Sequence, residues 1–444
     1  MLKVYAVSLG CDKNRVDTET MLGLLVQEGY EVTLVRQEAD VCLINTCGFI
    51  ASAKEEAINA ILDTARLKQE GRCAALVVAG CLAQRYPAEL MTEIPEIDVL
   101  VGTGQVGEIV GAVKRALKGE RHIEVGPPGY LSPRRAPRLL TTVAHTAYLK
   151  IAEGCSNCCS YCVIPRLRGR YRSKDPDAVF EEALSLVAGG ARELILVAQD
   201  TTRYGTDLND GSTLAGLLAR LAGIEAVRWL RVLYCYPTGI TPELIETIAR
   251  EPKVCRYLDI PMQHASDAVL RAMGRPTSRK DLIDLVAKLR RSIPGITLRS
   301  TFMVGFPGET EDDFVELLDF LREVRLDRAG FFAYSAEEGT AAARLPRQVS
   351  EEIKRERLEK AFALQSEIMQ EHNREKVGRE LTVLVDGRRG PFHWGRSEGD
   401  APGIDGRVFF GGPCWAKPGE FVSVRVERSL RYDLVGRITR LEPV

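Results

Sequence analysis

The feature that most constrains this chain is a loop with three cysteines, Cys155, Cys159 and Cys162, spaced C-x3-C-x2-C. The loop follows an apolar, strand-like run from Ala147 to Ala152. Cysteine thiolates hold iron-sulfur clusters, and a four-iron cube held by only three of them leaves one iron open to another ligand. The spacing therefore predicts a cluster with one reactive iron, placed just beyond the end of a strand.

A structural zinc site is the alternative interpretation of this loop. Zinc takes four ligands in a closed tetrahedron, and Cys158, inside the same loop, would be the fourth. However, the adjacent Cys158 and Cys159 do not easily face one ion, and no Cys-x2-Cys or His pair lies nearby to complete a zinc module. The ligand count favours the cluster, and we expect Cys158 to be a bystander.

The length of the chain, 444 residues, predicts two or three domains. We find no apolar run long enough to span a bilayer and no signal-like N-terminus, so we expect a cytoplasmic protein. Its 12 cysteines then indicate metal or redox chemistry rather than a disulfide framework. The net charge of −1 gives no support to a strongly basic, nucleic-acid-binding footprint.

Residues 1–118 alternate between apolar runs and helical patterns, which predicts an α/β domain with a doubly wound parallel sheet. Strands are expected at 2–9, 32–34, 39–46 and 74–80, and helices at 17–28 and 51–69. Cys11, Cys47 and Cys81 each follow the carboxyl end of a strand, the edge where such sheets bind ligands. We therefore expect these three to converge on a second site, and Cys42 and Cys73, inside or at the start of strands, to be packing residues.

Residues 119–140, rich in Pro, Gly and Arg, are expected to be a linker. From 141 to 372 the alternation resumes and predicts a partial barrel of six parallel strands with crossover helices. The strands are expected at 148–152, 193–198, 229–233, 257–261, 297–304 and 328–333. An active site should lie at their carboxyl ends. Candidate site residues at these ends are Gln199, Asp200, Gln263, His264 and Gly305. Gln263 and His264 are equally explained as polar residues that close a strand.

Residues 373–444 change to short alternating strands separated by Gly and Pro turns. This pattern predicts a small antiparallel β-barrel of about five strands, a type of domain that commonly binds a macromolecule. Basic and acidic side chains are interleaved, so its ligand is not readable from charge. The charged helix that precedes the barrel, at 350–376, is expected to be exposed and to join the domains.

In this order of domains the whole chain resembles the methylthiotransferases of the radical S-adenosylmethionine (radical SAM) superfamily, with a TRAM-like C-terminal barrel. Four stretches resemble the branch that modifies an aspartate of the small-subunit ribosomal protein S twelve: SLGCDKNRVDTE, NTCGFIASAKEEAI, YLDIPMQHAS and GRSEGDAPGIDG. Asp12, where that branch often has proline, and the doubled Cys158-Cys159 are departures, and neither is a ligand position. The alternatives are the branch that modifies adenosine in the tRNA anticodon loop and a non-catalytic, metal-stapled RNA-binding protein.

The resemblance implies two 4Fe-4S clusters and S-adenosylmethionine as cofactors. The first cluster, bound by Cys155, Cys159 and Cys162, would cleave S-adenosylmethionine to a radical. An auxiliary cluster, bound by Cys11, Cys47 and Cys81, would carry the sulfur to be inserted and methylated. Contacts to S-adenosylmethionine would come from Gln199, Asp200, Gln263 and Gly305. The partners implied are ribosomal protein S twelve, an unidentified electron donor and an unidentified sulfur source, with no membrane.

Overall fold

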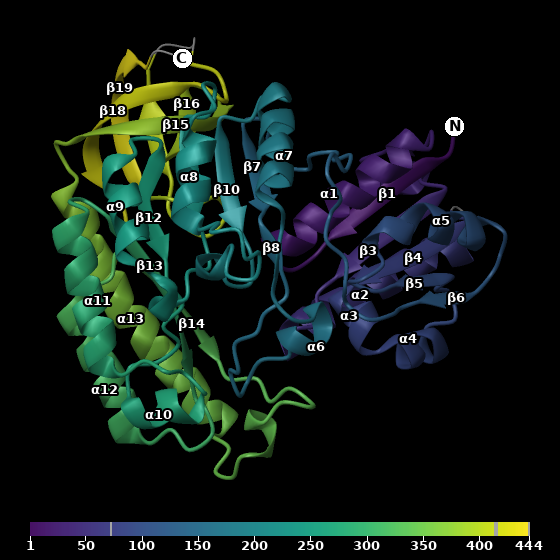
Figure 1. Cartoon of the computed structure of the whole chain (residues 1–444), viewed down its shortest axis with the longest axis horizontal. Helices are drawn as coiled ribbons and strands as arrows, with labels where there is room; N and C mark the ends of the chain where they lie inside the picture. The colour runs from purple at the N-terminus through teal and green to yellow at the C-terminus, as the bar shows by residue number, and fades with distance from the viewer. Residues whose placement is uncertain (72, 413–415, 443–444) are drawn as a thin grey trace.

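The computed structural model describes residues 1–71, 73–412 and 416–442. They form two six-stranded parallel sheets, each with helices, and a closed five-stranded barrel (Figure 1). The predicted α/β fold with a C-terminal β-barrel is thus confirmed. No helix in the described part of the chain is both long and apolar enough to cross a membrane.

The N-terminal sheet has the strand order β2-β1-β3-β4-β5-β6. Its strands are β1 (Lys3–Ser8), β2 (Glu31–Val32), β3 (Val41–Thr46), β4 (Ala75–Gly80), β5 (Val99–Val101) and β6 (His122–Glu124). Its helices are α1 (Asp12–Gln27), α2 (Ala51–Gln69), α3 (Cys81–Arg85), α4 (Pro87–Glu93) and α5 (Ile109–Leu117). Side chains of α1 and α5 pack on one face of the sheet, and those of α2, α3 and α4 on the other. This two-faced covering is the doubly wound arrangement that the alternation predicted.

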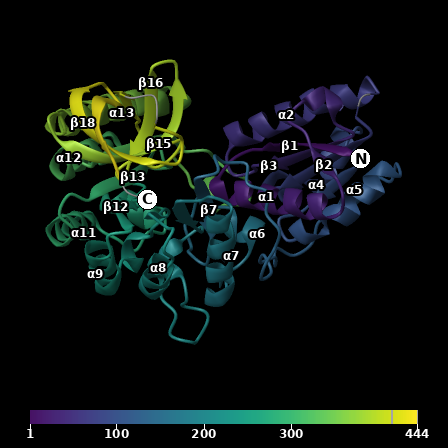
Figure 2. The ribbon, with the colours of Figure 1, turned by 90° about the horizontal axis from the view of Figure 1, so that it is seen from above.

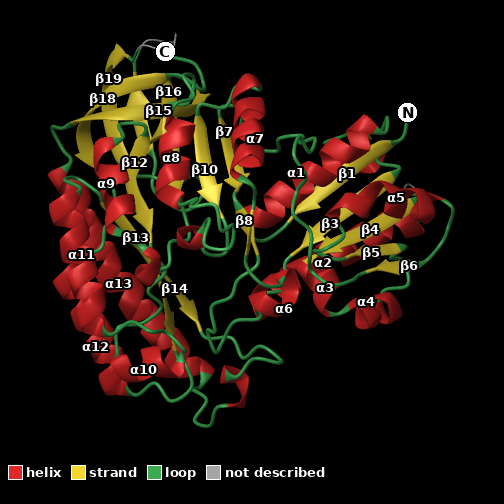
Figure 3. Cartoon of the chain, viewed as in Figure 1, coloured by secondary structure: helices red, strands yellow, loops and turns green. Residues whose placement is uncertain are grey.

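The central sheet runs in the order β14-β13-β12-β11-β10-β7 and leaves β7 and β14 as its two edges. Its strands are β7 (Thr146–Lys150), β10 (Glu193–Val197), β11 (Trp229–Val232), β12 (Val254–Asp259), β13 (Thr297–Val304) and β14 (Arg328–Ala333). Helices α7 (Pro176–Ala188), α8 (Leu214–Ala222), α9 (Pro242–Arg250), α11 (Arg279–Ser292), α12 (Glu311–Val324) and α13 (Glu351–Glu375) pack on its outer face in one large core (Figure 3). The short elements are α6 (Ile164–Arg168), α10 (Asp267–Ala272), β8 (Ala152–Glu153) and β9 (Arg172–Ser173). Six parallel strands with open edges make the expected partial barrel.

The C-terminal barrel closes in the order β15-β16-β17-β19-β18. Its strands are β15 (Glu380–Arg389), β16 (Phe392–Ser397), β17 (Val408–Gly411), β18 (Phe421–Ser429) and β19 (Leu434–Leu441). This barrel covers the amino-terminal ends of the central strands, where Trp229 meets Phe421 edge to face with ring centroids 4.9 Å apart. Buried ion pairs reinforce the junction, including Arg396 with Glu193 at 2.6 Å and Arg328 with Asp400 at 3.0 Å.

One hydrophobic cluster joins all three parts of the chain. It contains Val16 of α1, inward-facing residues of the central strands such as Ile195 and Tyr257, and Leu384 and Phe421 of the C-terminal barrel. Seen from above, α1 lies beside β7 (Figure 2). The N-terminal domain therefore docks on the open side of the partial barrel through a packed core as well as through polar contacts.

Two segments differ from the sequence-based expectation. The segment 119–140, expected to be a linker, contains β6, and its Arg138 is buried and pairs with Glu182 at 2.6 Å and with Glu19. Helix α13 was expected to be an exposed connector, and this was wrong in part, because Lys354 and Arg357 are buried against the central domain. For Arg138 and for α13 the cause is the same: a charged side chain was interpreted as solvated, although its partner lies far away in the sequence.

Candidate functional site

Three cysteine-bearing loops of the N-terminal domain pack against one another at the carboxyl edge of its sheet. A Cβ atom on Gly10 would lie 2.7 Å from the Cβ of Cys47, and one on Gly48 would lie 2.9 Å from the backbone of Cys81. Only glycine leaves room for so close an approach. The structure therefore brings Cys47 and Cys81 next to the loop that carries Cys11, as the positions of the strand ends predicted.

Burial favours the neutral form of the Cys47 and Cys81 thiols. It raises the pKa of Cys47 to about 12, with further repulsion from Cys81 and Cys11. Burial also raises the pKa of Cys81, although the nearby Arg168 guanidinium opposes the shift. Buried thiols that repel one another as thiolates are suited to a cationic centre, because metal binding releases the protons and compensates the negative charge.

The Cys155 to Cys162 loop is held by backbone and side-chain hydrogen bonds. The backbone N–H of Cys155 donates to the carbonyl of Gly169 at 3.0 Å, and that of Ser160 donates to Met273 at 2.9 Å. Cys155 is buried and its neighbour Cys158 is exposed. The Cys158 side chain is therefore open to solvent, whereas that of Cys155 is packed inside the protein.

Two sulfur atoms of this loop accept backbone hydrogen bonds. The N–H of Asn157 points at the Cys155 sulfur at 3.5 Å, and that of Ile164 points at the Cys162 sulfur at 3.4 Å. Burial raises the pKa of both thiols, to about 12 for Cys162, and these N–H groups partly oppose the shift. Such donors stabilise a thiolate and tune the potential of a cluster bound to it.

A buried ionic network lies between the two cysteine groups. Arg168, on the helix that follows Cys162, donates to Asp17 of α1 at 2.6 Å and to Glu153 at 3.1 Å. Lys150 contacts the same two carboxylates, Glu153 at 2.8 Å. All four side chains are at most 4% exposed. Two cations and two carboxylates balance, so the network joins the domains without leaving an unpaired buried charge.

The predicted cofactor-binding residues lie at the carboxyl ends of the central strands, as expected, and two of them contact the cysteine loop. Gln199 donates to Glu153 at 2.7 Å, and Asp200 accepts from Asn157 at 2.9 Å. Gln263 follows β12 with φ of +76°, a strained conformation for a residue with a side chain. These contacts place Gln199 and Asp200 beside Cys155, and their contact with S-adenosylmethionine stays a prediction.

His264 and Gly305 have structural neighbours instead. His264 is fully buried, its Nδ1 accepts from the backbone of Ser266 at 3.0 Å, and burial lowers its pKa to about 3. Gly305 has φ of +72°, and a Cβ there would lie 2.3 Å from the Lys354 side chain. The glycine is therefore required for the packing of α13, whether or not its backbone also meets a ligand.

Nowhere in residues 1–71, 73–412 and 416–442 do three cysteine, histidine or carboxylate side chains meet where one metal ion would sit. A zinc site needs such convergence. In a four-iron cube each thiolate binds a different iron. The lack of such a convergence among these residues therefore argues against a zinc site and does not concern a cluster.

Sequence reasoning missed Glu153, Arg168 and Asp17 as members of the site. The available signal was position: Glu153 comes two residues before Cys155, and Arg168 lies in the basic stretch after Cys162. Their charges nevertheless fit a solvated loop equally well, because nothing local shows that the partner is on another domain.

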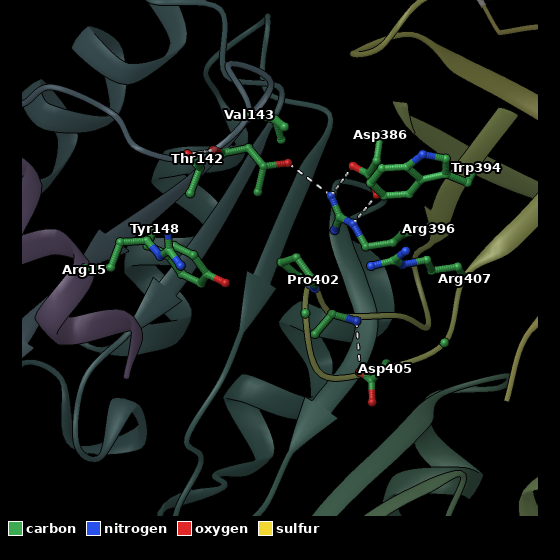
Figure 4. Close-up of a pocket in the computed structure, with 14 residues that line it drawn as sticks. Arg15, Thr142, Val143, Tyr148, Asp386, Trp394, Arg396, Pro402, Asp405 and Arg407 are labelled. Carbon is green, nitrogen blue, oxygen red and sulfur yellow. Dashed lines mark hydrogen bonds and ion pairs between the residues drawn. The ribbon is translucent and has the colours of Figure 1, made fainter. Parts of the chain in front are cut away.

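A separate cavity of about 280 Å³ lies where the C-terminal barrel meets β7 and α1, and it contains none of the six cysteines. Figure 4 shows Arg396 and Asp386 together at one side of it, and Arg15 beside Tyr148 at the other. The Arg407 guanidinium lies 4.7 Å from the centroid of the Trp394 ring. The stretch GRSEGDAPGIDG supplies much of this wall, so its residues hold the domains together at a distance from the cysteines.

Comparison with known protein families identifies the three parts of the chain. Residues 3–102 match the uncharacterized protein family UPF0004, residues 149–321 the radical SAM superfamily, and residues 377–439 the TRAM domain. The solved structure of the radical S-adenosylmethionine methyltransferase TsrM from Kitasatospora setae superposes with a TM-score of 0.55 at 18% identity. The match covers 74% of this chain and 72% of that one, and at this identity it shows the fold alone. The partial barrel and its cysteine loop thus define a radical SAM enzyme, a class that uses a 4Fe-4S cluster and S-adenosylmethionine.

Two relatives are similar to the chain over nearly its entire length. The ribosomal protein uS12 methylthiotransferase RimO of Desulforudis audaxviator is 59% identical over 99% of this chain and 98% of its own. The protein of the same name from Pelotomaculum thermopropionicum is 56% identical over 98% of this chain and 99% of its own. The chain belongs to this RimO family of methylthiotransferases.

Proposed function

We propose that this enzyme inserts a methylthio group at the β-carbon of an aspartate of ribosomal protein uS12. The observation that carries the proposal is the joining of two three-cysteine groups, one from each α/β domain, through a single buried ionic network. A reaction that both generates a radical and delivers sulfur needs two centres held in fixed relation. The substrate is inferred from the names of the relatives.

The six cysteines are proposed to divide into two sets of ligands. Cys155, Cys159 and Cys162 would hold the cluster that binds S-adenosylmethionine, and the N-terminal set would hold the auxiliary cluster. The N-terminal ligands are Cys11, Cys47 and Cys81. When bound, these groups supply an electron to S-adenosylmethionine, a substrate radical and the sulfur that is transferred. The close approach of Gly10 and Gly48 and the mutually repelling thiols support the N-terminal set. The backbone N–H groups that point at the sulfurs of Cys155 and Cys162 support the other set.

The protein's own groups fix this arrangement. Glu153 is buried beside the loop and is held by Gln199, Lys150 and Arg168, so its oxygens cannot rotate freely. Although burial alone would raise the pKa of Glu153, Lys150 and Arg168 hold it well below its usual range. Both oxygens of this carboxylate are occupied, since its other oxygen accepts from Gln199 and from the backbone N–H of Gly154, so Glu153 fixes the start of the cysteine loop against the central strands.

Anaerobic reconstitution tests the proposal. With iron and sulfide the chain should bind about eight iron atoms, turn brown and, once reduced, consume S-adenosylmethionine. The Cys155→Ala variant should keep about half of the iron and lose all consumption. A colourless protein that takes up zinc would contradict the assignment.

Mass spectrometry identifies the substrate. Ribosomal proteins and tRNA nucleosides would be compared between cells with and without the gene. We expect the methylthio group to be absent from uS12 and tRNA to be unchanged. Loss of the group from tRNA would instead indicate an anticodon-loop adenosine as the substrate. The electron donor and sulfur source would be further partners, and the proposed site of action is the cytoplasm.

A further inference from the structure

The segment from Ser335 to Ala342, which follows edge strand β14, contacts both cysteine-bearing parts of the enzyme. On one side, the backbone N–H of Ala342 donates to the carbonyl of Ser160, between Cys159 and Cys162, at 2.9 Å. Gly339 packs so closely on Arg166 of α6 that a Cβ there would lie 1.9 Å from its guanidinium. The segment is therefore fixed to the radical SAM loop and to the helix that follows it.

On its other side the same segment contacts the N-terminal domain through one buried carboxylate. Glu337 accepts hydrogen bonds from Lys54 at 2.8 Å and from Arg85 at 2.7 Å, and its side chain is 2% exposed. Arg85 also donates to the carbonyl of Gly48 at 2.9 Å and to that of Glu338 at 3.1 Å. The guanidinium thus joins the segment directly to the residue after Cys47.

Both cations come from helices that begin at a cysteine of the auxiliary group or a few residues after one. Lys54 is in the first turn of α2, shortly after Cys47, and Arg85 is the last residue of α3, whose first residue is Cys81. A displacement of either helix would move its cysteine and break its bond to Glu337. The carboxylate is itself held rigidly, because Ser335 donates to its other oxygen at 2.7 Å. Burial alone would raise the pKa of Glu337. The hydrogen bonds from Lys54, Ser335 and Arg85 nevertheless hold that pKa below its usual range, so the Glu337 carboxylate stays ionised.

We propose that Glu337 is a positioning residue that sets the separation between the two cysteine groups and so couples radical formation to sulfur transfer. This inference rests on the proposed function above. Asp17 and its partners lie near edge strand β7, whereas Glu337 follows edge strand β14. Without the Glu337 contacts the N-terminal domain loses its charged anchor on the β14 side and keeps there only bonds to neutral groups, from Arg85 to the carbonyl of Glu338 and from Ala51 to Ser335, so it can shift about the β7 contact. Radical formation would continue while the sulfur and the substrate carbon lose their alignment.

The variant that tests this is Glu337→Gln, with Glu338→Gln as its matched control. Both remove one negative charge and keep the shape of the side chain, but Glu338 is exposed and its side chain has no ion pair in the described part of the protein. The measured quantity is the ratio of methylthiolated substrate to 5'-deoxyadenosine in the reconstituted holoenzyme. Because small misplacements of reacting atoms cost large factors in rate, we expect this ratio to fall about tenfold in Glu337→Gln and to stay unchanged in Glu338→Gln.

A spectroscopic measurement separates positioning from a general loss of fold. The magnetic coupling between the two reduced clusters, read by electron paramagnetic resonance, depends on their separation and should weaken or broaden in Glu337→Gln at unchanged iron content. A second variant of the wild-type protein, Arg85→Lys, keeps the positive charge beside Glu337 and should therefore lose less of the ratio and of the coupling than Glu337→Gln does. An unchanged ratio together with unchanged coupling in Glu337→Gln would overturn the proposal.

Hydrogen exchange on the cluster-free protein tests whether Glu337 positions the N-terminal domain, even if the proposed function is wrong. Glu337→Gln should speed backbone exchange at the starts of α2 and α3 and in the segment 335–342, and Glu338→Gln should not. Equal exchange in the two variants would refute the positioning role. If the wild-type protein binds only one cluster, the proposed function is refuted. The exchange comparison would then still decide whether Glu337 is a positioning residue.

Discussion

The substitution Asp17→Asn removes one of two carboxylates from the buried network between the domains. Asp17 accepts charge-assisted bonds from Arg168 and Lys150, and each such bond contributes about 1.5 to 3 kcal/mol. In the variant, Lys150 and Arg168 share Glu153 alone, which leaves one buried positive charge uncompensated. Breaking a buried pair in this way costs about 3 to 5 kcal/mol, and we expect that loss in the free energy of unfolding.

Urea unfolding of the cluster-free protein, followed by far-ultraviolet circular dichroism under reducing conditions, measures this loss. The matched control is Asp63→Asn, which removes the same charge from an exposed pair with Arg66 in the same domain. That surface pair, with side chains 56% and 74% exposed, should contribute less than about 1 kcal/mol. If the two variants unfold within about 1 kcal/mol of each other, the network does not hold the domains together and the reasoning is wrong.

Three further results are expected. Cys155→Ala should abolish cleavage of S-adenosylmethionine, whereas Cys47→Ala should retain cleavage and lose sulfur insertion; full product from the latter, measured by mass spectrometry, would contradict the two-cluster assignment. Burial raises the pKa of Glu309 to about 7, above its value in the unfolded chain, so its contribution to stability is present below about pH 4.5 and is lost as the pH rises through about 7. Glu309→Gln should abolish that decline in a pH series of unfolding free energies, and an unaltered slope would rule out this carboxyl as its source. Glu193→Gln removes the carboxylate that Arg396 and the buried Arg231 share. It should destabilise the junction with the C-terminal barrel by about 3 to 5 kcal/mol. Proteolysis between α13 and β15 at the wild-type rate would argue against this expectation.

The fold was predictable from the sequence because apolar periodicity determines it locally. Buried strands such as Ala75–Gly80 consist of continuous apolar runs, and the cysteine loops follow directly at their ends. In a parallel sheet those ends share one edge, so the convergence of Cys47 and Cys81 needed no knowledge of tertiary contacts. The start of α1 was placed at Asp17, whereas the helix begins at Asp12. Its first turn is polar and buried against another domain, and a polar stretch before a helix is normally interpreted as a loop.

The ionic part of the site was not predictable for a different reason. Arg168 and Asp17 lie 151 positions apart, and no pattern within either segment identifies the other as its partner. A charged side chain in a sequence has the same appearance whether water or a buried carboxylate surrounds it. Glu337 shows the same limit, because its neighbour Glu338 has identical chemistry and the opposite environment.

The hydrophobic cluster shared by all three parts has a consequence for the order of events during synthesis. Val16 is among the first residues of that cluster to leave the ribosome, and Phe421 is the last. All six proposed ligands, Cys11 to Cys162, are therefore translated well before this cluster is complete. At roughly 5 to 20 residues per second the interval lasts on the order of ten seconds or more. During that time the nascent N-terminal domain lacks the contacts that Glu337 later makes with α2 and α3, so a carrier that delivers iron and sulfide meets its cysteine loops before they are fixed against the rest of the protein.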